Sequence, residues 1–525
     1  MKTNTFSKKS NTFPTLFPVE VDTNFGDILH EGFALLNKDP EILKKIEHDL
    51  DCYAMMKKAK RLADKVWRDR QTLPLGLELQ EFADSLDDSK KDTESEQETT
   101  ISLGIGRPRM KPETVFLFML FRGYFDSVTD VRATDRIIDS ITILSFFQNH
   151  GWGNLPKRST IHDNIQAVSY DTRTYIYRSQ LADVRDQGID DYKRLTLDST
   201  AVMANSRWPV DSGVICRLLE RAFKNSQGLS KYGVPNFMPW HTALWLSKIS
   251  QLNFKINVIS GKGTRVKRRG FYRILYTEAG KFITHLRREI IKHRESMETV
   301  DLPPSLTERL TQIRTLIQND IDDAEKVIGY SRRRILNGET IPNSEKILSL
   351  SDGSAAFIVK GNRETVLGYR PQVGRSGSGF VTVLHVPEGN AADSPQLVSL
   401  VEEAISNTGV VSNIVSVDDG YSSTHGIGSV RMIPGTDTVS ASGAKAKKII
   451  SAEDWDSETY REARRNRSSV ESLMYTLKYV YGFGNLRRRG IDAVRIELLE
   501  KAIVHNLSRL AVLKKRRLRQ PEQAA

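Results

Sequence analysis

The sequence predicts an α/β fold in which a sheet is flanked by helices, with a large helical insertion after the first strand and a helical N-terminal domain. An alternating, strand-like segment at 194–202 is followed by helical periodicity up to about residue 350. Runs rich in β-branched and aromatic residues then occupy 355–386, and strand-like and helical segments alternate from there onward. Such alternation is typical of α/β domains.

Composition shifts divide the 525 residues into several parts, since the chain is longer than one ordinary domain. Between residues 81 and 100, eight acidic residues stand against two lysines, which predicts a disordered linker. The predicted parts are a helical N-terminal region with a loose arm (1–83), the acidic linker (84–104), a helical domain (105–190), the domain with the sheet (191–512, its insertion at about 203–350) and a basic tail (513–525).

Composition excludes several classes of protein. Hydrophobic residues make up 39% and charged residues 27% of the chain, and no apolar run approaches the length of a membrane span. The first residues contain lysines without the apolar stretch of a secretory signal. The two cysteines, Cys52 and Cys216, cannot form a disulfide framework or a cysteine-based zinc site. We therefore expect a protein of the reducing cytoplasm.

The charge of the chain favours a polyanionic partner. The net charge is +12, and residues 461–520 contain 16 Lys/Arg against 5 Asp/Glu. A surface that faces DNA requires such an excess. A solvated helical tail is the alternative interpretation of the same pattern.

Helical patterns fill the region before the first strand. They include ETVFLFMLFRGYF, RIIDSITILSFF and LPKRSTIHDNIQAV, and the last has helix-start signals at Ser159 and Thr160 after Lys157 and Arg158. A short basic helix entry suits a helix that approaches a DNA groove. A helical dimerisation or packing module is the alternative.

The first strand and the insertion come next. RLTLDSTAV alternates Leu195 and Leu197 on one side, which predicts a strand that ends near an exposed acid. Within the insertion the clearest helix begins at Ser305, because Ser305 and Glu308 have the spacing of a capping box. Its apolar positions recur at helical spacing up to Ile328, which indicates core packing.

An antiparallel meander is predicted after the insertion. AAFIVK, TVLGYR and GFVTVLHV are β-rich runs separated by the turn signals GN and GRSGSG. We then expect a helix capped by Asp393, a buried strand from Ser412 to Val417 that ends at Asp418, a short strand TVSAS and long basic helices.

Three acidic residues are candidates for chemistry. Asp198 and Asp418 follow strands, and strand ends in an α/β sheet converge at one edge. Glu471 lies on a helix further downstream. Carboxylates are the ligands that hard divalent cations prefer, and two such ions can promote displacement at a phosphate. The neighbouring Asp419 is an alternative ligand, but Gly420 follows Asp418 at the spacing that lets the chain turn.

The helix around Glu471 is amphipathic. At helical spacing Arg467, Glu471 and Lys478 share one face, and the opposite stripe is formed by Val470, Leu473, Leu477 and Val480. Cations beside the acid would hold the DNA backbone. An ordinary surface helix with a salt bridge is the alternative.

Several motifs together resemble those of bacterial insertion-sequence DDE transposases. The first-aspartate segment LDSTAVMANSRWPVDS, the segment EGNAADSPQL, the second-aspartate strand end VDDGYSS and the glutamate signature R-x3-E-x6-K of Arg467, Glu471 and Lys478 occur in the family's order. LRRRGIDAVRIELLEKAIVHNLSRLA looks like the family's closing helices. The resemblance extends from about residue 110 to residue 511.

The resemblance implies a ribonuclease-H-like mixed sheet in the catalytic domain, 191–512. It implies that the enzyme cuts at the terminal inverted repeats of its element and joins the ends to new DNA. Asp198, Asp418 and Glu471 would be the catalytic residues and would hold two Mg²⁺ ions, for which Mn²⁺ can substitute. We expect a homodimer or a higher oligomer on DNA, in a bacterial cytoplasm and associated with the nucleoid. The candidate DNA-contacting residues are Arg467, Lys478, Arg464, Arg465, Arg158, Lys157, Arg487 and Arg488.

The sequence departs from the family pattern at two points, and two other functions are compatible with the same motifs. Position 464 is Arg where the glutamate signature often begins with Tyr, and the extra sequence follows the first aspartate. A non-catalytic DNA-binding descendant of a transposase, or another ribonuclease-H-like nuclease, would have similar motifs. Trp208 and Tyr421 could stack on an unpaired base, although core packing is the favoured interpretation for both.

Overall fold

The computed structural model describes residues 24–72, 110–125, 156–230, 240–259, 262–297, 302–359 and 365–519. The predicted acidic linker and the segment RIIDSITILSFF lie outside these residues. The chain divides into two compact units. The first comprises Met1–Asp51, Met110–Trp208 and Ser351–Ala525, and the second comprises Cys52–Arg109 and Pro209–Leu350. Each unit is described by itself.

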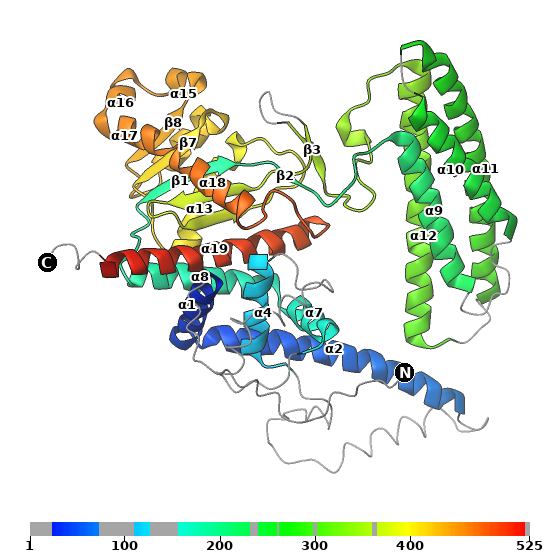
Figure 1. Ribbon diagram of the computed structural model, residues 1–525, viewed down its shortest axis with the longest axis horizontal. Helices are drawn as coiled ribbons and strands as arrows, with labels where there is room; N and C mark the ends of the chain where they lie inside the picture. The colour runs from blue at the N-terminus through cyan, green and yellow to red at the C-terminus, as the bar shows by residue number, and fades with distance from the viewer. Residues whose placement is uncertain are drawn as a thin grey trace, which may run out of the picture. The chain divides into compact units, whose positions relative to one another are not determined.

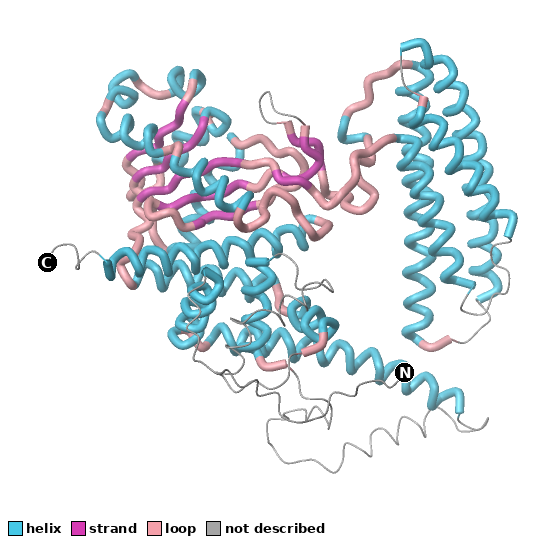
Figure 2. The backbone as a smooth tube through the Cα atoms, in the orientation of Figure 1, coloured by secondary structure: helices cyan, strands magenta, loops and turns pink. Residues whose placement is uncertain are grey.

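The first unit contains a mixed five-stranded sheet (Figures 1 and 2). Its central strand β1 pairs antiparallel with β5 on one side and parallel with β7 on the other. Strands β6 and β8 complete the two edges, so the order is β6-β5-β1-β7-β8. The strands are β1 (Arg194–Ser199), β5 (Gln372–Ser376), β6 (Val381–His385), β7 (Ile414–Asp418) and β8 (Thr438–Ser442). The predicted mixed α/β class is confirmed.

A separate three-stranded sheet of order β2-β4-β3 contains β2 (Val202–Met203), β3 (Ala356–Ile358) and β4 (Val366–Tyr369). The prediction of one continuous meander is therefore wrong, because the chain changes sheets between β4 and β5. The GRSGSG run is also only partly a turn, since Gly374, Arg375 and Ser376 belong to β5. A Cβ atom at Gly374 would lie 2.8 Å from the Cβ atom of Val383, so the glycine permits close strand packing.

Helices pack on the main sheet and supply its core. Leu195 and Leu197 of β1 and Val415 and Val417 of β7 are buried against helical side chains. Helices α13 (Leu397–Thr408) and α19 (Ile491–Arg519) contact β6, α17 (Glu458–Asn466) contacts β7 and β8, and α18 (Ser469–Tyr479) contacts β1 and β5. Short helices α14 (Thr424–Arg431), α15 (Ala444–Ile449) and α16 (Ala452–Asp456) follow β7 and β8.

The N-terminal helices gather around α19. Helices α1 (Asn24–Lys38), α4 (Pro112–Phe125) and α8 (Tyr170–Asp186) each contact it, and α7 (Arg158–Ala167) contacts α4. Helix α2 spans Glu41–Thr72. Helix α4 is apolar on nearly all sides and is correspondingly buried from Thr114 to Gly123. The compact unit thus includes helices from both sides of the domain boundary predicted near residue 190.

The second unit is helical where it is described. It contains α9 (Asp211–Ser230), α10 (Trp240–Val258), η1 (Lys262–Thr264), α11 (Arg265–Met297), α12 (Pro304–Arg332), η2 (Arg333–Asn337) and η3 (Asn343–Glu345). The four long helices share a core that includes Leu218, Leu275 and Ile317. Helix α12 begins at Pro304, so Ser305 lies inside the helix and is not its cap. Proline suits a first helical position because it has no amide to leave unpaired.

Among the helices that the structure describes, none combines the length and the apolar character needed to cross a membrane.

Candidate active site

Asp198 and Asp418 lie on neighbouring strands at the same edge of the main sheet. The parallel register pairs Thr196 of β1 with Ser416 of β7, and two residues further along both strands are Asp198 and Asp418. Adjacent strands are about 4.8 Å apart, and residues at equivalent register share a face. The two carboxylates therefore project from the same face of the sheet, side by side.

Backbone amides fix both aspartates locally. The amide of Ser199 donates to Asp198 Oδ1 at 2.7 Å, and the amide of Gly420 donates to Asp418 Oδ1 at 2.9 Å. The second of these bonds begins the short helix η5 (Asp419–Tyr421) directly after β7. Asp198 is 8% exposed. Both carboxylates are thus held at strand ends, as the sequence motif predicts.

Asp419 makes different contacts from the neighbouring Asp418. Its carboxylate accepts hydrogen bonds from the backbone amides of Lys445 at 3.2 Å and Ala446 at 2.9 Å, at the start of α15. Burial acts to raise the pKa of Asp419, but these amides outweigh burial and lower it. A Cβ at Gly443, whose φ is +131°, would lie 2.3 Å from Asp419 Cγ. Asp419 therefore anchors α15, which favours Asp418 as the candidate ligand.

Tyr421 lies among the acidic residues, fully buried. Burial raises its pKa well above the ordinary value, and the negative charges of Asp393, Asp198 and Asp418 raise it further. Its hydroxyl donates to Gln372 Oε1. Core packing is therefore confirmed for Tyr421, and this hydroxyl remains protonated. Trp208 differs, since it is 56% exposed and its ring packs on Phe357 at 4.9 Å between centroids.

Asp393 lies beside the two aspartates, although its place in the sequence predicts only a helix cap. Its carboxylate accepts hydrogen bonds from Arg370, from Gln372 Nε2 at 2.9 Å and from Ser199 Oγ at 3.2 Å. It makes no side-chain cap to η4 (Ser394–Gln396), so the predicted cap is wrong. Asp393 instead joins the end of β1 to the start of β5. The segment EGNAADSPQL, which contains Asp393, was the sequence signal that could have indicated this position.

Glu471 stands apart from the two aspartates. Its side chain is 63% exposed and accepts a hydrogen bond from Arg467 Nη2 at 3.0 Å. Val470, Leu473 and Leu477 form the buried face of α18, as predicted. Val480 is 54% exposed because it follows the last helical residue, Tyr479, so its place in the predicted stripe is wrong.

One hydrogen bond places α17 on the aspartate side of the sheet. Ser416, on the same strand face as Asp418, donates its hydroxyl to the carbonyl of Ala463 in α17 at 3.2 Å. Helix α18 then contacts β1, the strand that carries Asp198 (Figure 1). Within the described ranges, however, no three His, Cys, Asp or Glu side chains lie close enough together to hold a metal ion.

The donor chemistry fits a hard divalent cation in part. Asp198 and Asp418 supply carboxylate oxygens from fixed neighbouring positions, which suits Mg²⁺. Glu471 would supply a third oxygen if its side chain left Arg467 and turned toward the sheet. Because the Glu471–Arg467 pair is exposed, breaking it costs little.

The candidate DNA-contacting cations lie on or beside helices α7, α17 and α18 and in the segment before α19. Lys157 and Arg158 are exposed at the start of α7, and Arg465 is exposed on α17. The Arg464 guanidinium lies 4.4 Å from the centre of the Trp455 ring. Lys478 is half-buried on α18. A cavity of about 460 Å³ on α16 and α17 is lined by Asp456, Glu458, Arg461, Arg464 and Arg465.

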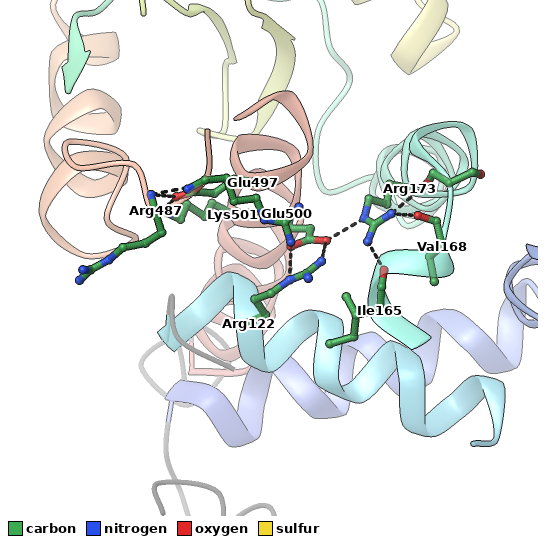
Figure 3. Close-up of polar contacts among 10 residues, drawn as sticks. Arg122, Ile165, Val168, Arg173, Arg487, Glu497, Glu500 and Lys501 are labelled. Carbon is green, nitrogen blue, oxygen red and sulfur yellow. Dashed lines mark hydrogen bonds and ion pairs between the residues drawn. The ribbon is translucent and has the colours of Figure 1, made fainter. Parts of the chain in front are cut away.

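The side chains of Arg487 and Arg488 lie in different environments, one exposed and the other mostly buried. Arg487 is exposed and its side chain extends away from the ion cluster around Glu500, while its backbone amide donates to Glu497 at 3.1 Å (Figure 3). Arg488 is only 16% exposed and lies 3.7 Å from the Glu500 carboxylate. Arg488 is therefore less accessible to DNA than Arg487.

Glu500 is the centre of that buried ion cluster. Arg122 of α4 and Arg173 of α8 both donate to its carboxylate (Figure 3). Burial acts to raise the pKa of Glu500, but the arginines outweigh it and lower the pKa to about 2. Burial in turn lowers the pKa of Arg122 to about 10. This cluster connects the N-terminal helices to α19, which runs along the sheet.

One segment of the chain matches a known protein family. Residues 351–507 match the family model of the transposase DDE domain. This match confirms the predicted resemblance to DDE transposases. The matched segment includes Asp418 and Glu471 but begins after Asp198. Searches of curated proteins and of solved structures gave no significant match.

Proposed function

We propose that this chain is an active transposase that binds the terminal inverted repeats of its insertion sequence, cuts the DNA there and joins the ends to new DNA. DDE transposases are polynucleotidyl transferases that use divalent metal ions, which supports this proposal. The observation that carries it is the side-by-side position of Asp198 and Asp418 at the ends of parallel strands. The sheet order, with β1 between an antiparallel and a parallel neighbour, supports a ribonuclease-H-like catalytic domain.

The acidic residues would hold the metal. Asp198 and Asp418 would be shared ligands of two Mg²⁺ ions, or of Mn²⁺ in their place, and Glu471 would complete the set. Bound there, such ions activate an attacking oxygen and stabilise a leaving oxygen at a phosphate. Asp393 and Tyr421 would act only as positioning residues, because their polar atoms are bonded to Arg370 and Gln372 behind the aspartates.

The cations would hold the DNA. Lys478 lies on the same helix as Glu471, and Arg467 lies just before this helix and pairs with Glu471, so a phosphate bound to both cations would lie beside the metal site. The exposed residues Arg465 and Arg487, together with Arg464, extend this surface. Lys157 and Arg158 would contact DNA from the start of α7. Pairing of two DNA ends requires a homodimer or a higher oligomer.

A cleavage assay tests the proposal. Full-length protein with Mg²⁺ is incubated with duplex DNA that carries the inverted repeats of its element, and nicked and joined products are quantified. Asp198→Ala should lower product formation by at least about 1,000-fold, because a metal ligand is lost. Asp492→Ala, whose side chain is 88% exposed on α19, is the matched control and should retain activity. Full activity of Asp198→Ala would refute the proposal.

One observation favours a second function. Glu471 is exposed and paired with Arg467, so the three acidic residues are not gathered in this conformation. A transposase descendant that binds DNA without cutting it would tolerate this arrangement. Tight, sequence-specific DNA binding without metal-dependent cleavage would favour this second function.

A further inference from the structure

The second compact unit contains a long segment without acidic residues. From Arg221 to Thr277 the sequence has 11 Lys/Arg and no Asp or Glu over 57 residues. The acidic residues of the unit flank this segment, and α12 alone carries Glu308, Asp320, Asp322, Asp323 and Glu325. Charge is therefore segregated along the chain, with the excess of cations on α10 and the first half of α11.

Only some of these cations are neutralised within the unit. Arg221 pairs with Asp320, and Lys248 pairs with Glu278 at 3.1 Å. Arg265, Lys267 and Arg273 are exposed and have no ion pair with any residue that the structure describes. Within the described part of the chain, these three cations are therefore left to the solvent or to a partner.

The three cations lie on the first turns of α11. Lys267 and Arg273 lie on the two flanks of the stripe formed by the buried residues Tyr272, Leu275 and Tyr276, and Arg265 is exposed at the first residue of the helix. Helix α11 has no acidic residue in its first turn, so the positive end of the helix dipole adds to the side-chain charge. Like charges this close together repel one another, and a bound polyanion would neutralise them.

Apolar side chains are exposed beside these cations. Phe254 is 68%, Val258 60% and Val266 82% exposed, at the end of α10 and the start of α11. The two helices contact each other, so these side chains and the cations belong to one helical hairpin. A basic surface with a few apolar side chains suits the sugar–phosphate edge of a DNA groove.

We propose that the exposed cations Arg265, Lys267 and Arg273, here called the α11 basic surface, bind the phosphate backbone of duplex DNA without reading its sequence. Eight residues separate Arg265 from Arg273, which is about 12 Å along a helix, and duplex DNA presents several phosphates over that length. The surface lies outside the matched transposase domain, so this DNA contact is additional to those around Glu471.

The test measures DNA binding by the full-length protein without divalent metal. A labelled duplex that lacks the element's inverted repeats is titrated by fluorescence anisotropy at several salt concentrations. The triple variant Arg265→Ala, Lys267→Ala, Arg273→Ala should bind at least about 10-fold more weakly at low salt. The slope of log affinity against log salt should decrease by about 2 to 3, because each lost phosphate contact removes about 0.9.

A matched triple variant controls for net charge. Lys281→Ala, Lys292→Ala and Arg333→Ala remove the same charge from the same unit, but each of these cations already pairs with a glutamate. This control should keep most of the parent affinity and slope. Equal weakening in both triple variants would overturn the assignment to the α11 basic surface, as would parent affinity and slope in the first.

A charge-conserving variant separates binding from folding. Arg265→Lys with Arg273→Lys should bind within about 3-fold of the parent, since phosphate contacts without base readout need charge more than a guanidinium. Loss of binding in this variant, with an unchanged circular dichroism spectrum, would overturn the proposal. Neither metal nor inverted repeats are used, so failure of the cleavage assay would leave this result intact.

Discussion

At the scale of single residues, Asp393 holds the edge of the sheet together behind the two aspartates. It is 4% exposed and pairs with Arg370, which is 15% exposed. Asp393→Asn would leave the partly buried Arg370 guanidinium without its counter-charge, so we expect the free energy of unfolding to fall by about 3 kcal/mol. Denaturant unfolding measures this change. The exposed control Asp437→Asn should change stability by less than about 1 kcal/mol.

His505 predicts a pH dependence of stability. It lies in α19, 7% exposed, with Nε2 located 3.2 Å from the carbonyl of Gly379. Burial lowers its pKa to about 4. The unfolded chain binds a proton near pH 6.5, whereas the folded chain does so only near pH 4. This contribution is therefore present above about pH 6.5 and is lost as the pH falls toward 4, by about 3 kcal/mol in total.

His505→Gln tests that prediction, because glutamine keeps a donor for Gly379 but does not titrate. Denaturant unfolding of both proteins across this pH range should show a steeper loss for the parent. Parallel curves for the two proteins would contradict the assignment.

The positions of some residues near the candidate site could be predicted from the sequence, and those of others could not. Asp198 and Asp418 were predictable because each ends an alternating strand, and Gly420 marked the turn after the second. The network of Asp393 was not, because its partners Arg370, Gln372 and Ser199 come from other segments and no local pattern reports such pairing. The inward position of Arg488 was not predictable either, since a basic run does not reveal which member turns inward.

At the scale of secondary structure, the close packing around Gly374 explains why strand β5 contains a glycine. A Cβ at Gly374 would meet both Val383 and Leu195, at 2.8 Å and 3.1 Å. We expect Gly374→Ala to cost about 1 to 3 kcal/mol through overpacking. Thermal unfolding measures this, and Gly353→Ala is the control because nothing lies within 4 Å of the added Cβ. Equal stability of the two variants would contradict the close packing of β5.

The elements with strong periodicity were the predictable ones. Strands β1, β7 and β8 and helix α12 appear where alternation or helical spacing places them. The pairing of β3, β4, β5 and β6 was not predictable, because β-rich runs look alike whichever sheet they join. Their division between two sheets depends on pairing with β1 and β2, which lie more than 150 residues earlier in the chain.

At the scale of the whole molecule, the helical insertion has the properties of an independent folding unit. It has its own core, and its two ends are fastened by Arg334 to Asp211 at 2.7 Å and by Arg221 to the carbonyl of Leu350 at 2.8 Å. We expect residues 209–350 alone to give a helical circular dichroism spectrum and a cooperative thermal transition. A non-cooperative transition would show that the unit needs the rest of the chain.

The distribution of charge over the molecule also differs from what the sequence indicates. Part of the basic C-terminal surplus faces inward, since Lys501 pairs with Glu497 and the Lys501 side chain is 1% exposed. Lys514 and Lys515 pair with Glu31 and Asp27 of α1. Counting charges along the chain could not separate these internal pairs from a DNA-facing surface, because the acidic partners of Lys514 and Lys515 are almost 500 residues away.

The central claim is that Asp198, Asp418 and Glu471 form one active site, and Glu471 tests it most directly. Glu471→Gln removes an exposed ion pair, so stability should change by less than about 1 kcal/mol. The measurement is Mg²⁺-dependent joining of pre-cut inverted-repeat ends to target DNA by this variant and by the parent. We expect the variant to join the ends at least about 100-fold more slowly, because a metal ligand is lost. Joining at the parent rate by the folded variant would contradict the claim.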